Sequence, residues 1–210
     1  MEFSGTFELE NTTVDEVWLA LSDPVLIEES LPGCQFLVEV EDTDVDFDDL
    51  RERTADRDVE PTSDTDVIAE RAFEEGGHYA ALMQISVGPV NPTFETVVTI
   101  DHREYPEMSA AGEGSSGDSS FEMSSGMVLA ESEDGDGVAV EWTTEAEVFG
   151  KVAQMGQRVI SPVANRVVKR LFSSVQSRRH DSQVVDEETE DSGRSLVDRV
   201  LGRSGDSDNA

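Results

Sequence analysis

Residues 151–179 read KVAQMGQRVISPVANRVVKRLFSSVQSRR, and this stretch decides the fold that the sequence predicts. Apolar residues recur in it at steps of three and four, which indicates a long helix with one apolar face over about 150–176. Proline removes a backbone N–H and crowds the preceding turn, so we expect Pro162 to kink or split this helix near Ser161. The apolar face consists of Val152, Met155, Val159, Val163, Val167 and Leu171.

The chain ahead of this helix alternates between apolar and polar residues, as half-buried strands do. Residues 2–10 form the first predicted strand, with the apolar side chains on one face. Two short helices follow, and Thr13 with Glu16 has the spacing of a capping box at the start of the first. Further strands are expected at about 34–41, 67–75, 79–87 and 94–100, two within 107–131, and a last one at 138–148.

A single antiparallel sheet of this length has an apolar face that must be covered. The only long amphipathic element in the sequence is the helix predicted at 150–176. Two packed layers around one core are the general solution for such elements. The sequence therefore predicts an α+β fold in which a curved antiparallel sheet wraps around a long C-terminal helix.

The 210 residues divide by composition into a domain at 1–176 and an acidic tail at 177–210 that we expect to be disordered. Within the domain, residues 41–67 are dense in Asp and Glu, and we expect a mobile, solvated insertion between two strands. Its alternating aspartates, Asp42 to Asp48, lack the glycine and the flanking helices of a calcium-binding EF-hand. We therefore predict no metal and no cofactor.

The formal net charge is −32, from 47 acidic and 15 basic residues. An acidic, lysine-poor surface of this kind resembles the salt-adapted proteins of halophilic archaea; an ordinary acidic protein with disordered acidic segments is the alternative. The charge argues against nucleic acid as a partner. The single cysteine, Cys34, excludes an internal disulfide, and no signal peptide or membrane-spanning run is visible. We expect a cytoplasmic protein, with peripheral contact at the inner face of the membrane left open.

Four separated motifs resemble those of the CoxG family of carbon monoxide dehydrogenase proteins. They occur in the family's order and together cover about residues 1–176. They are VWLALSDP at 17–24, LPGC at 31–34, the segment from Tyr79 to Val90, and GKVAQMGQRVI at 150–160 followed by Leu171 and Phe172.

The resemblance implies the helix-grip fold of the START-like SRPBCC superfamily, whose members enclose an apolar cavity between the sheet and the long helix. It also implies an accessory role, in recruitment or maturation, beside a carbon monoxide dehydrogenase-type molybdenum hydroxylase. The long insertion at 41–67 and Pro162 depart from the family pattern.

The inward faces of the predicted strands and helix carry the residues expected to line such a cavity. A hydrophobic molecule, a lipid or a quinone, suits a lining of adaptable methionines and aromatic rings with a few polar anchors. A filled core is the alternative reading of the same residues. The predicted lining consists of Tyr79, Met83, Ile85, Phe94, Thr96, Met108, Phe121, Met123, Ser125, Met127, Trp142, Thr144, Val152, Met155 and Val159.

The basic residues of the long helix must point away from its apolar face. Pairing with the acidic rims of the sheet is one explanation; docking to an anionic membrane or an acidic partner protein is another. The second explanation predicts a docking surface made by Lys151, Arg158, Arg166, Lys169 and Arg170.

The sequence shows no catalytic constellation, and we predict no enzymatic activity. His78, His102 and His180 have no acid or nucleophile at a suitable spacing. Two alternatives stay open: a cyclase- or hydratase-like enzyme, which needs a titratable side chain inside the cavity, and an interaction scaffold without a ligand.

Overall fold

The computed structural model describes residues 1–57, 61–62 and 64–177. The chain divides into two compact units, Met1–Val175 and Gln176–Ala210, and the features below belong to the first. The predicted acidic tail at 177–210 lies outside the described residues from 178 onward.

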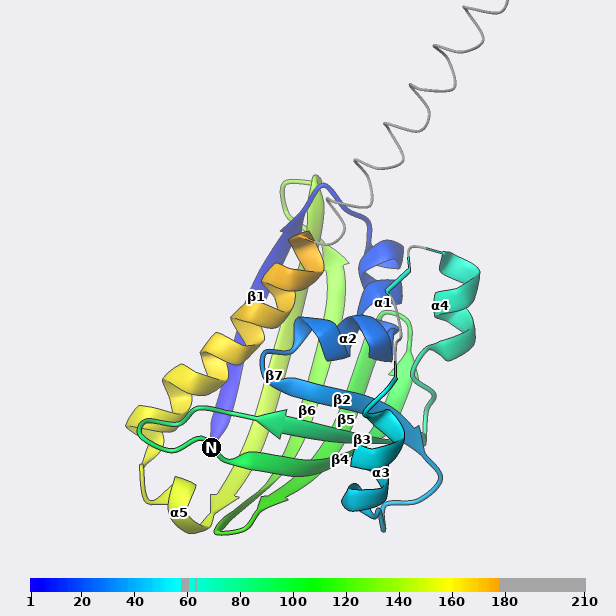
Figure 1. Cartoon of the computed structure of the whole chain (residues 1–210). Helices are drawn as coiled ribbons and strands as arrows, with labels where there is room; N and C mark the ends of the chain where they lie inside the picture. The colour runs from blue at the N-terminus through cyan, green and yellow to red at the C-terminus, as the bar shows by residue number, and fades with distance from the viewer. Residues whose placement is uncertain (58–60, 63, 178–210) are drawn as a thin grey trace, which may run out of the picture. The chain divides into compact units, whose positions relative to one another are not determined.

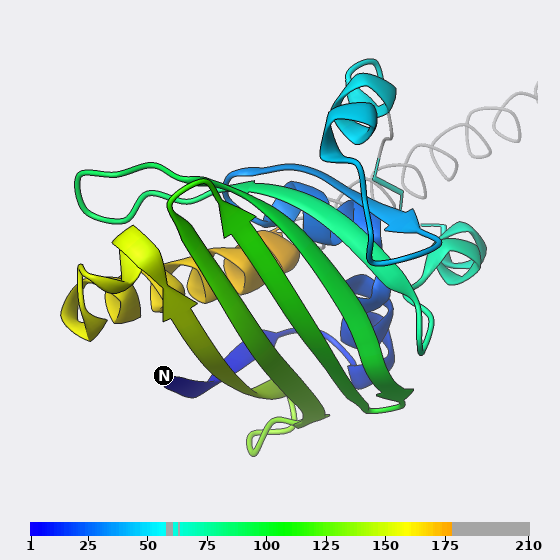
Figure 2. The same cartoon turned by 90° about the horizontal axis from the view of Figure 1, so that it is seen from below.

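A seven-stranded antiparallel sheet forms most of the first unit, in the order β1-β7-β6-β5-β4-β3-β2. Figures 1 and 2 show that the sheet is strongly curved and that the last helix lies on its concave side. The predicted α+β fold is confirmed. The strands are β1 (Glu2–Glu10), β2 (Cys34–Val40), β3 (His78–Gln84), β4 (Thr93–Glu104), β5 (Glu107–Ser116), β6 (Ser119–Glu131) and β7 (Gly137–Phe149).

Two short helices, α1 (Val14–Ser22) and α2 (Pro24–Ser30), follow β1. The predicted capping box is present, because the Thr13 hydroxyl accepts from the backbone N–H of Glu16 and the Glu16 carboxylate accepts from that of Thr13. Asp23 ends α1 and caps α2 by accepting from the backbone N–H of Val25. The buried Asp23 carboxylate also pairs with Arg71 at 2.7 Å, which fixes the α1–α2 corner.

The last helix is split, but not at the predicted place. A short helix α5 (Gly150–Ala153) is followed by a break at 154–156, and a longer helix runs over 157–177. Gly156, with φ +74°, makes the break, while the backbone stays helical through Ser161 and Pro162. The predicted split near Ser161 is wrong because Pro162 lies so close to the start of the helix that it removes only one intrahelical hydrogen bond.

The turn from β7 into α5 requires glycine at position 150. Gly150 has φ +76°, and a Cβ there would lie 2.0 Å from the carbonyl oxygen of Asp118. The turn is fastened by Ser119, whose hydroxyl accepts from the backbone N–H of Val152 at 3.0 Å. The entry of the last helix is therefore fixed against the start of β6.

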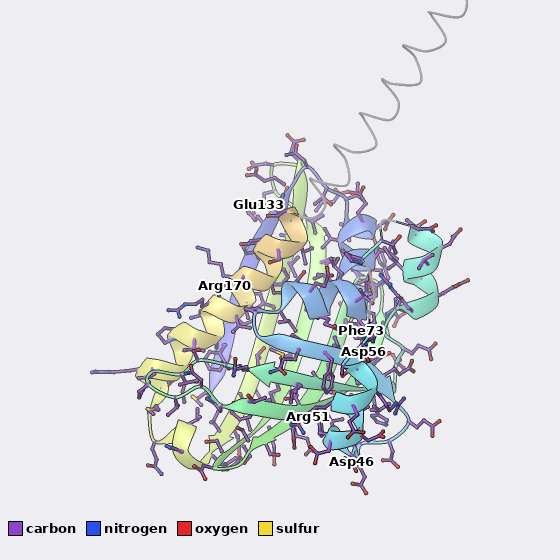
Figure 3. All side chains as sticks on the ribbon, viewed as in Figure 1. Asp46, Arg51, Asp56, Phe73, Glu133 and Arg170 are labelled. Atoms are coloured by element: carbon purple, nitrogen blue, oxygen red, sulfur yellow. The ribbon has the colours of Figure 1, made fainter. Side chains whose placement is uncertain are left out.

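The 41–67 insertion contains a helix that the sequence analysis missed, α3 (Phe47–Thr54). Asp46 caps it, and Leu50 is buried against Phe36 and Leu82 on the convex face of β2 and β3. Arg51 bridges Asp48 and Glu95, at 2.7 and 2.5 Å. Figure 3 labels Asp46 and Arg51 on this helix.

The strand predicted at 67–75 is wrong, because the structure forms a helix there, α4 (Thr65–Arg71). Asp64 accepts from the backbone N–H groups of Asp66 and Val67 and so starts the helix. Ile68 is its buried residue, and Phe73 directly after it enters the core. Seven residues with one apolar contact point give too short a pattern to distinguish helix from strand.

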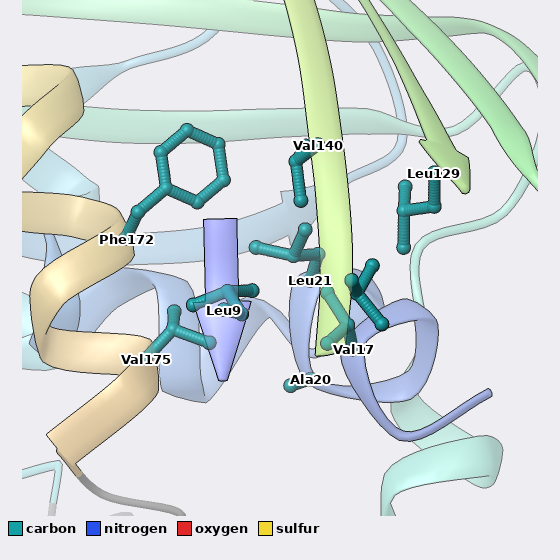
Figure 4. Close-up of a cluster of buried hydrophobic side chains, with 9 residues drawn as sticks. Leu9, Val17, Ala20, Leu21, Leu129, Val140, Phe172 and Val175 are labelled. Carbon is teal, nitrogen blue, oxygen red and sulfur yellow. The ribbon is translucent and has the colours of Figure 1, made fainter. Parts of the chain in front are cut away.

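The main core joins the end of helix 157–177 to the sheet and to α1, as Figure 4 shows. Phe172 stacks on Phe7 of β1, with ring centroids 5.1 Å apart, and Val175 is fully buried. The buried members of this cluster are Leu9, Val17, Ala20, Leu21, Leu129, Val138, Val140, Phe172 and Val175.

Candidate functional site: the concave face under the last helix

The middle of the concave face has a floor of small side chains from three neighbouring strands. Strand register places them in two adjacent rows, since Gly112 pairs with Met123 and Met123 with Ala146, while Ala110 pairs with Ser125 and Ser125 with Thr144. All of these residues are half-buried, although they face the helix. We call this set the small-residue strip: Ala110, Gly112, Ser125, Thr144 and Ala146.

Tightly packed apolar clusters lie on both sides of the strip. At one side, Phe94 and Val87 pack against Val152 of α5 and against Val159 at the start of helix 157–177. At the other side, Phe172 and Val175 anchor the far part of the same helix in the main core. Val167, between these anchor points, is only half-buried. The helix is thus held at both ends, and the small side chains lie between the two.

Hydroxyl groups mark the strip and its border. Ser125 Oγ and Thr144 Oγ1 lie 2.7 Å apart and form a hydrogen bond on the floor. Thr96, paired with Gly114 on the adjoining row, is buried, and its Oγ1 has no hydrogen-bond partner in the described part of the chain. An unpaired buried hydroxyl costs on the order of 1–3 kcal/mol, so it marks a place where a polar atom of a bound molecule is stabilised.

Glycine at position 114 keeps this hydroxyl reachable. A Cβ on Gly114 would lie 2.5 Å from the Phe121 ring and 2.8 Å from Thr96 Oγ1. Such contacts would force both neighbours to move. The floor thus stays low beside Thr96, and Phe121 can pack edge-on against Phe94 at 5.2 Å.

The residues predicted to line a cavity fall into three groups in the structure. Ser125, Thr144 and Met123 belong to the strip or its rows, and Thr96 borders it. A second group packs at the α5 side: Met83, Ile85, Phe94, Phe121, Val152, Met155 and Val159. A third group belongs to the clusters at the opposite side: Tyr79, Met108, Met127 and Trp142.

Tyr79 is a core residue whose hydroxyl is already engaged. Its ring packs edge-on against Phe73 at 4.7 Å, and its hydroxyl accepts from the backbone N–H of Glu74 at 3.0 Å. Burial raises the pKa of the Tyr79 phenol. Sequence analysis did not single out Ala110, Gly112 or Ala146 as site residues, because small residues carry no signal until strand register places them together.

These features can be compared with known proteins. The family model for CoxG, the carbon monoxide dehydrogenase protein of that name, matches residues 71–179, just over half of the chain. The chain belongs to the CoxG family. No curated protein matches this CoxG-family chain.

Solved structures share the fold of this CoxG-family chain at low sequence identity. A conserved protein from Geobacillus kaustophilus is 22% identical with a TM-score of 0.65, covering 87% of this chain and 97% of that one. Norcoclaurine synthase from Thalictrum is 10% identical with a TM-score of 0.51, covering 87% and 96%. The Zhui aromatase/cyclase from Streptomyces is 10% identical with a TM-score of 0.51, covering 85% and 92%. At these identities the likeness establishes the helix-grip fold alone.

The histidines of this CoxG-family chain that the structure describes do not approach the strip. His78 pairs in register with Thr99 and donates to or accepts from its hydroxyl at 2.9 Å, on the convex face. His102 lies 3.3 Å from the Glu75 carboxylate and lines the convex side as well. Within the described residues, no group of three or more His, Cys, Asp or Glu side chains is arranged to hold a metal.

The five predicted docking residues, from Lys151 to Arg170, are all exposed on α5 and helix 157–177 (Figure 3 labels Arg170). Among the described residues, none of the five forms an ion pair within 4 Å, whereas Arg51, Arg57 and Arg71 all do. Pairing with the rims of the sheet, the first explanation for these cations, is therefore not what the described residues show.

A recess of about 500 Å³ lies on the opposite, convex face of the sheet, around Gly126. Its walls include Ser4, Thr143 and Glu141, whose register places them on the side away from the helix. It is therefore a different place from the predicted cavity. No helix in the described part of the chain is both long and apolar enough to span a bilayer.

Proposed function

We propose that this CoxG-family chain binds a hydrophobic small molecule, lipid-like or quinone-like, on the small-residue strip beneath helix 157–177. The carrying observation is that the strip stays half-buried between two fully packed clusters. Ligand sites in proteins are mostly apolar with a few placed polar groups, and Thr96 with the Ser125–Thr144 pair supplies such groups.

Native mass spectrometry of the purified chain tests this proposal. We expect a stoichiometric apolar compound that dissociates on activation, and a rise in the midpoint of thermal unfolding when decylubiquinone or a phospholipid extract is added. A chain that carries no such compound and whose unfolding midpoint no probe changes would contradict the proposal.

A matched pair of variants locates the site. Ser125→Val removes the hydroxyl that faces the helix, and Ser124→Val makes the same change on the neighbouring exposed position. We expect the thermal stabilisation by the probe to fall only in Ser125→Val. Equal behaviour of the two variants would place the bound molecule elsewhere.

We propose further that the chain serves as an accessory protein of a carbon monoxide dehydrogenase-type molybdenum hydroxylase, as its family's name suggests. The exposed, unpaired cations of helix 157–177 support a docking role toward an acidic partner or an anionic membrane. We expect Arg166→Glu combined with Arg170→Glu to abolish co-purification with such an enzyme. Unchanged co-purification would exclude this face as the docking surface.

The proposed role is binding rather than catalysis, in the cytoplasm. A cyclase- or hydratase-like reaction would need a titratable group on the strip, and the strip residues Ala110, Gly112, Ser125, Thr144 and Ala146 include none. A ligand-free scaffold is the competing account that the mass measurement above decides.

A further inference from the structure

Arg103 of β4 is a cation on the concave face without an acidic partner among the described residues. Register pairs it with Met108, which is two residues along β5 from Ala110 of the strip. The chain carries 47 acidic residues against 15 basic ones, so an arginine that faces inward without a carboxylate is unexpected. Three other arginines, Arg51, Arg57 and Arg71, each pair with a carboxylate from a distant part of the chain.

The guanidinium of Arg103 makes no hydrogen bond or ion pair among the described residues, and its Nε is buried without a partner. Its Cζ lies 5.4 Å from the centre of the Trp18 ring. Trp18 in turn packs edge-on against Tyr105, at 5.8 Å. A ring face attracts a cation but accepts no N–H in the way an oxygen does, so donors of the guanidinium stay unused.

The carboxylate that contacts the Arg103 backbone is turned to other groups. Glu75 accepts from the backbone N–H of Arg103 at 2.8 Å and lies 3.3 Å from Nδ1 of His102. It is not within 4 Å of the Arg103 guanidinium. The positive charge therefore faces the interior of the grip uncompensated, beside Met108 and Trp18 of the apolar clusters.

We propose that Arg103 is a specificity residue that receives the anionic head group, a carboxylate or phosphate monoester, of an amphiphile whose apolar chain lies on the small-residue strip. Guanidinium matches both anions with two parallel hydrogen bonds, and such charge-assisted bonds are the strong ones. This inference rests on the proposed function and narrows it from any apolar molecule to an anionic amphiphile.

Calorimetric titration of the full chain with three probes of one chain length tests it: dodecanoate, dodecyl phosphate and dodecan-1-ol. We expect both anions to bind at least about tenfold more tightly than the alcohol, because hydrogen bonds to charged groups exceed neutral ones by that margin. Preference for only one of the two anions identifies which head group fits, and it supports the inference equally.

The variant Arg103→Gln is expected to bind all three probes about equally, since it keeps donors but loses the charge. Arg158→Gln, on the exposed surface of helix 157–177, is the matched control and should keep the preference for anions. Arg103→Lys should keep part of it. A merely structural role of Arg103 would weaken every probe alike and leave the ratio between anion and alcohol unchanged.

Two outcomes overturn the inference, and they differ. If dodecan-1-ol binds the native chain as tightly as the anions do, the anchor is wrong while the hydrophobic site stands. If none of the three probes binds, the proposed function fails and the inference fails with it.

Discussion

The concave face of the sheet contains two kinds of surface that the same helix covers. Beside Phe172 and Val175 the side chains are large, interlocked and fully buried, whereas under the middle of helix 157–177 they are small and half-buried. Both zones belong to the same strands, since Val140 and Ala146 lie six residues apart on β7.

The difference teaches that stability and binding are assigned to separate parts of one interface. Large residues at both ends of the helix fix its distance from the sheet, and this spacing decides how much room the small residues leave beneath it. Protein interiors are otherwise packed to crystal-like density, so half-buried small residues inside a grip need a reason.

The largest effect is expected in the packed zone. Phe172→Ala should lower the free energy of unfolding by about 3–5 kcal/mol, because it removes the stack on Phe7 and leaves a cavity that cannot collapse. Phe149→Ala is the matched control, since Phe149 is 46% exposed, and it should change the value by less than about 0.5 kcal/mol. Denaturant titration measures both, and similar values would mean that helix 157–177 is not anchored as described.

A second comparison concerns the convex face. Leu50 of α3 covers β2 and β3 there and is 4% exposed, whereas Val128 of β6 is 40% exposed on an uncovered part. We expect Leu50→Ala to cost about 2–4 kcal/mol and Val128→Ala almost nothing, again by denaturant titration. If Leu50→Ala were neutral, α3 would not be folded onto the sheet.

A smaller effect is expected at the edge of the packed zone, at Cys34 of β2. Burial, and then the charge of Glu28, raise the pKa of its thiol to about 12 in the folded protein. The unfolded chain releases this proton near pH 8.5, so the folded state holds more protons between about pH 9 and 12 and the free energy of unfolding falls as the pH rises there.

Comparison of the native chain with Cys34→Ala at pH 8 and pH 10 measures this share. The native chain should lose on the order of 1 kcal/mol more than the variant between the two pH values. Equal losses would show that the thiol ionises as easily in the folded protein as in the unfolded chain.

The sequence predicts the fold well where periodicity is long. The strands at 2–10 and 138–148 and the helix over 157–177 each carry enough turns or alternations to be read from the chain alone. The errors fall on short elements: α3 and α4 each have one buried residue, and their capping aspartates, Asp46 and Asp64, were hidden among many other acids.

The site was harder to predict, for a physical reason. Large inward residues such as Met83, Phe94 and Trp142 stand out in a sequence, but they build the walls and the packed ends. The floor is defined by what is small, and Ala110, Gly112 and Ala146 become a feature only when register brings three strands together. Arg103 was missed because its meaning depends on which side chains lie opposite it in the fold.

The most direct measurement fills the strip. Ala146→Phe places a ring beneath helix 157–177, and Glu145→Phe places the same ring on the exposed side of the same strand. Binding of dodecanoate and the free energy of unfolding are measured for both variants. If the strip has room, Ala146→Phe changes the stability by less than about 0.5 kcal/mol and weakens binding at least about tenfold, while Glu145→Phe leaves binding intact. If the strip is a filled core, Ala146→Phe costs about 1–3 kcal/mol as overpacking does, binding does not discriminate between the variants, and the account is wrong.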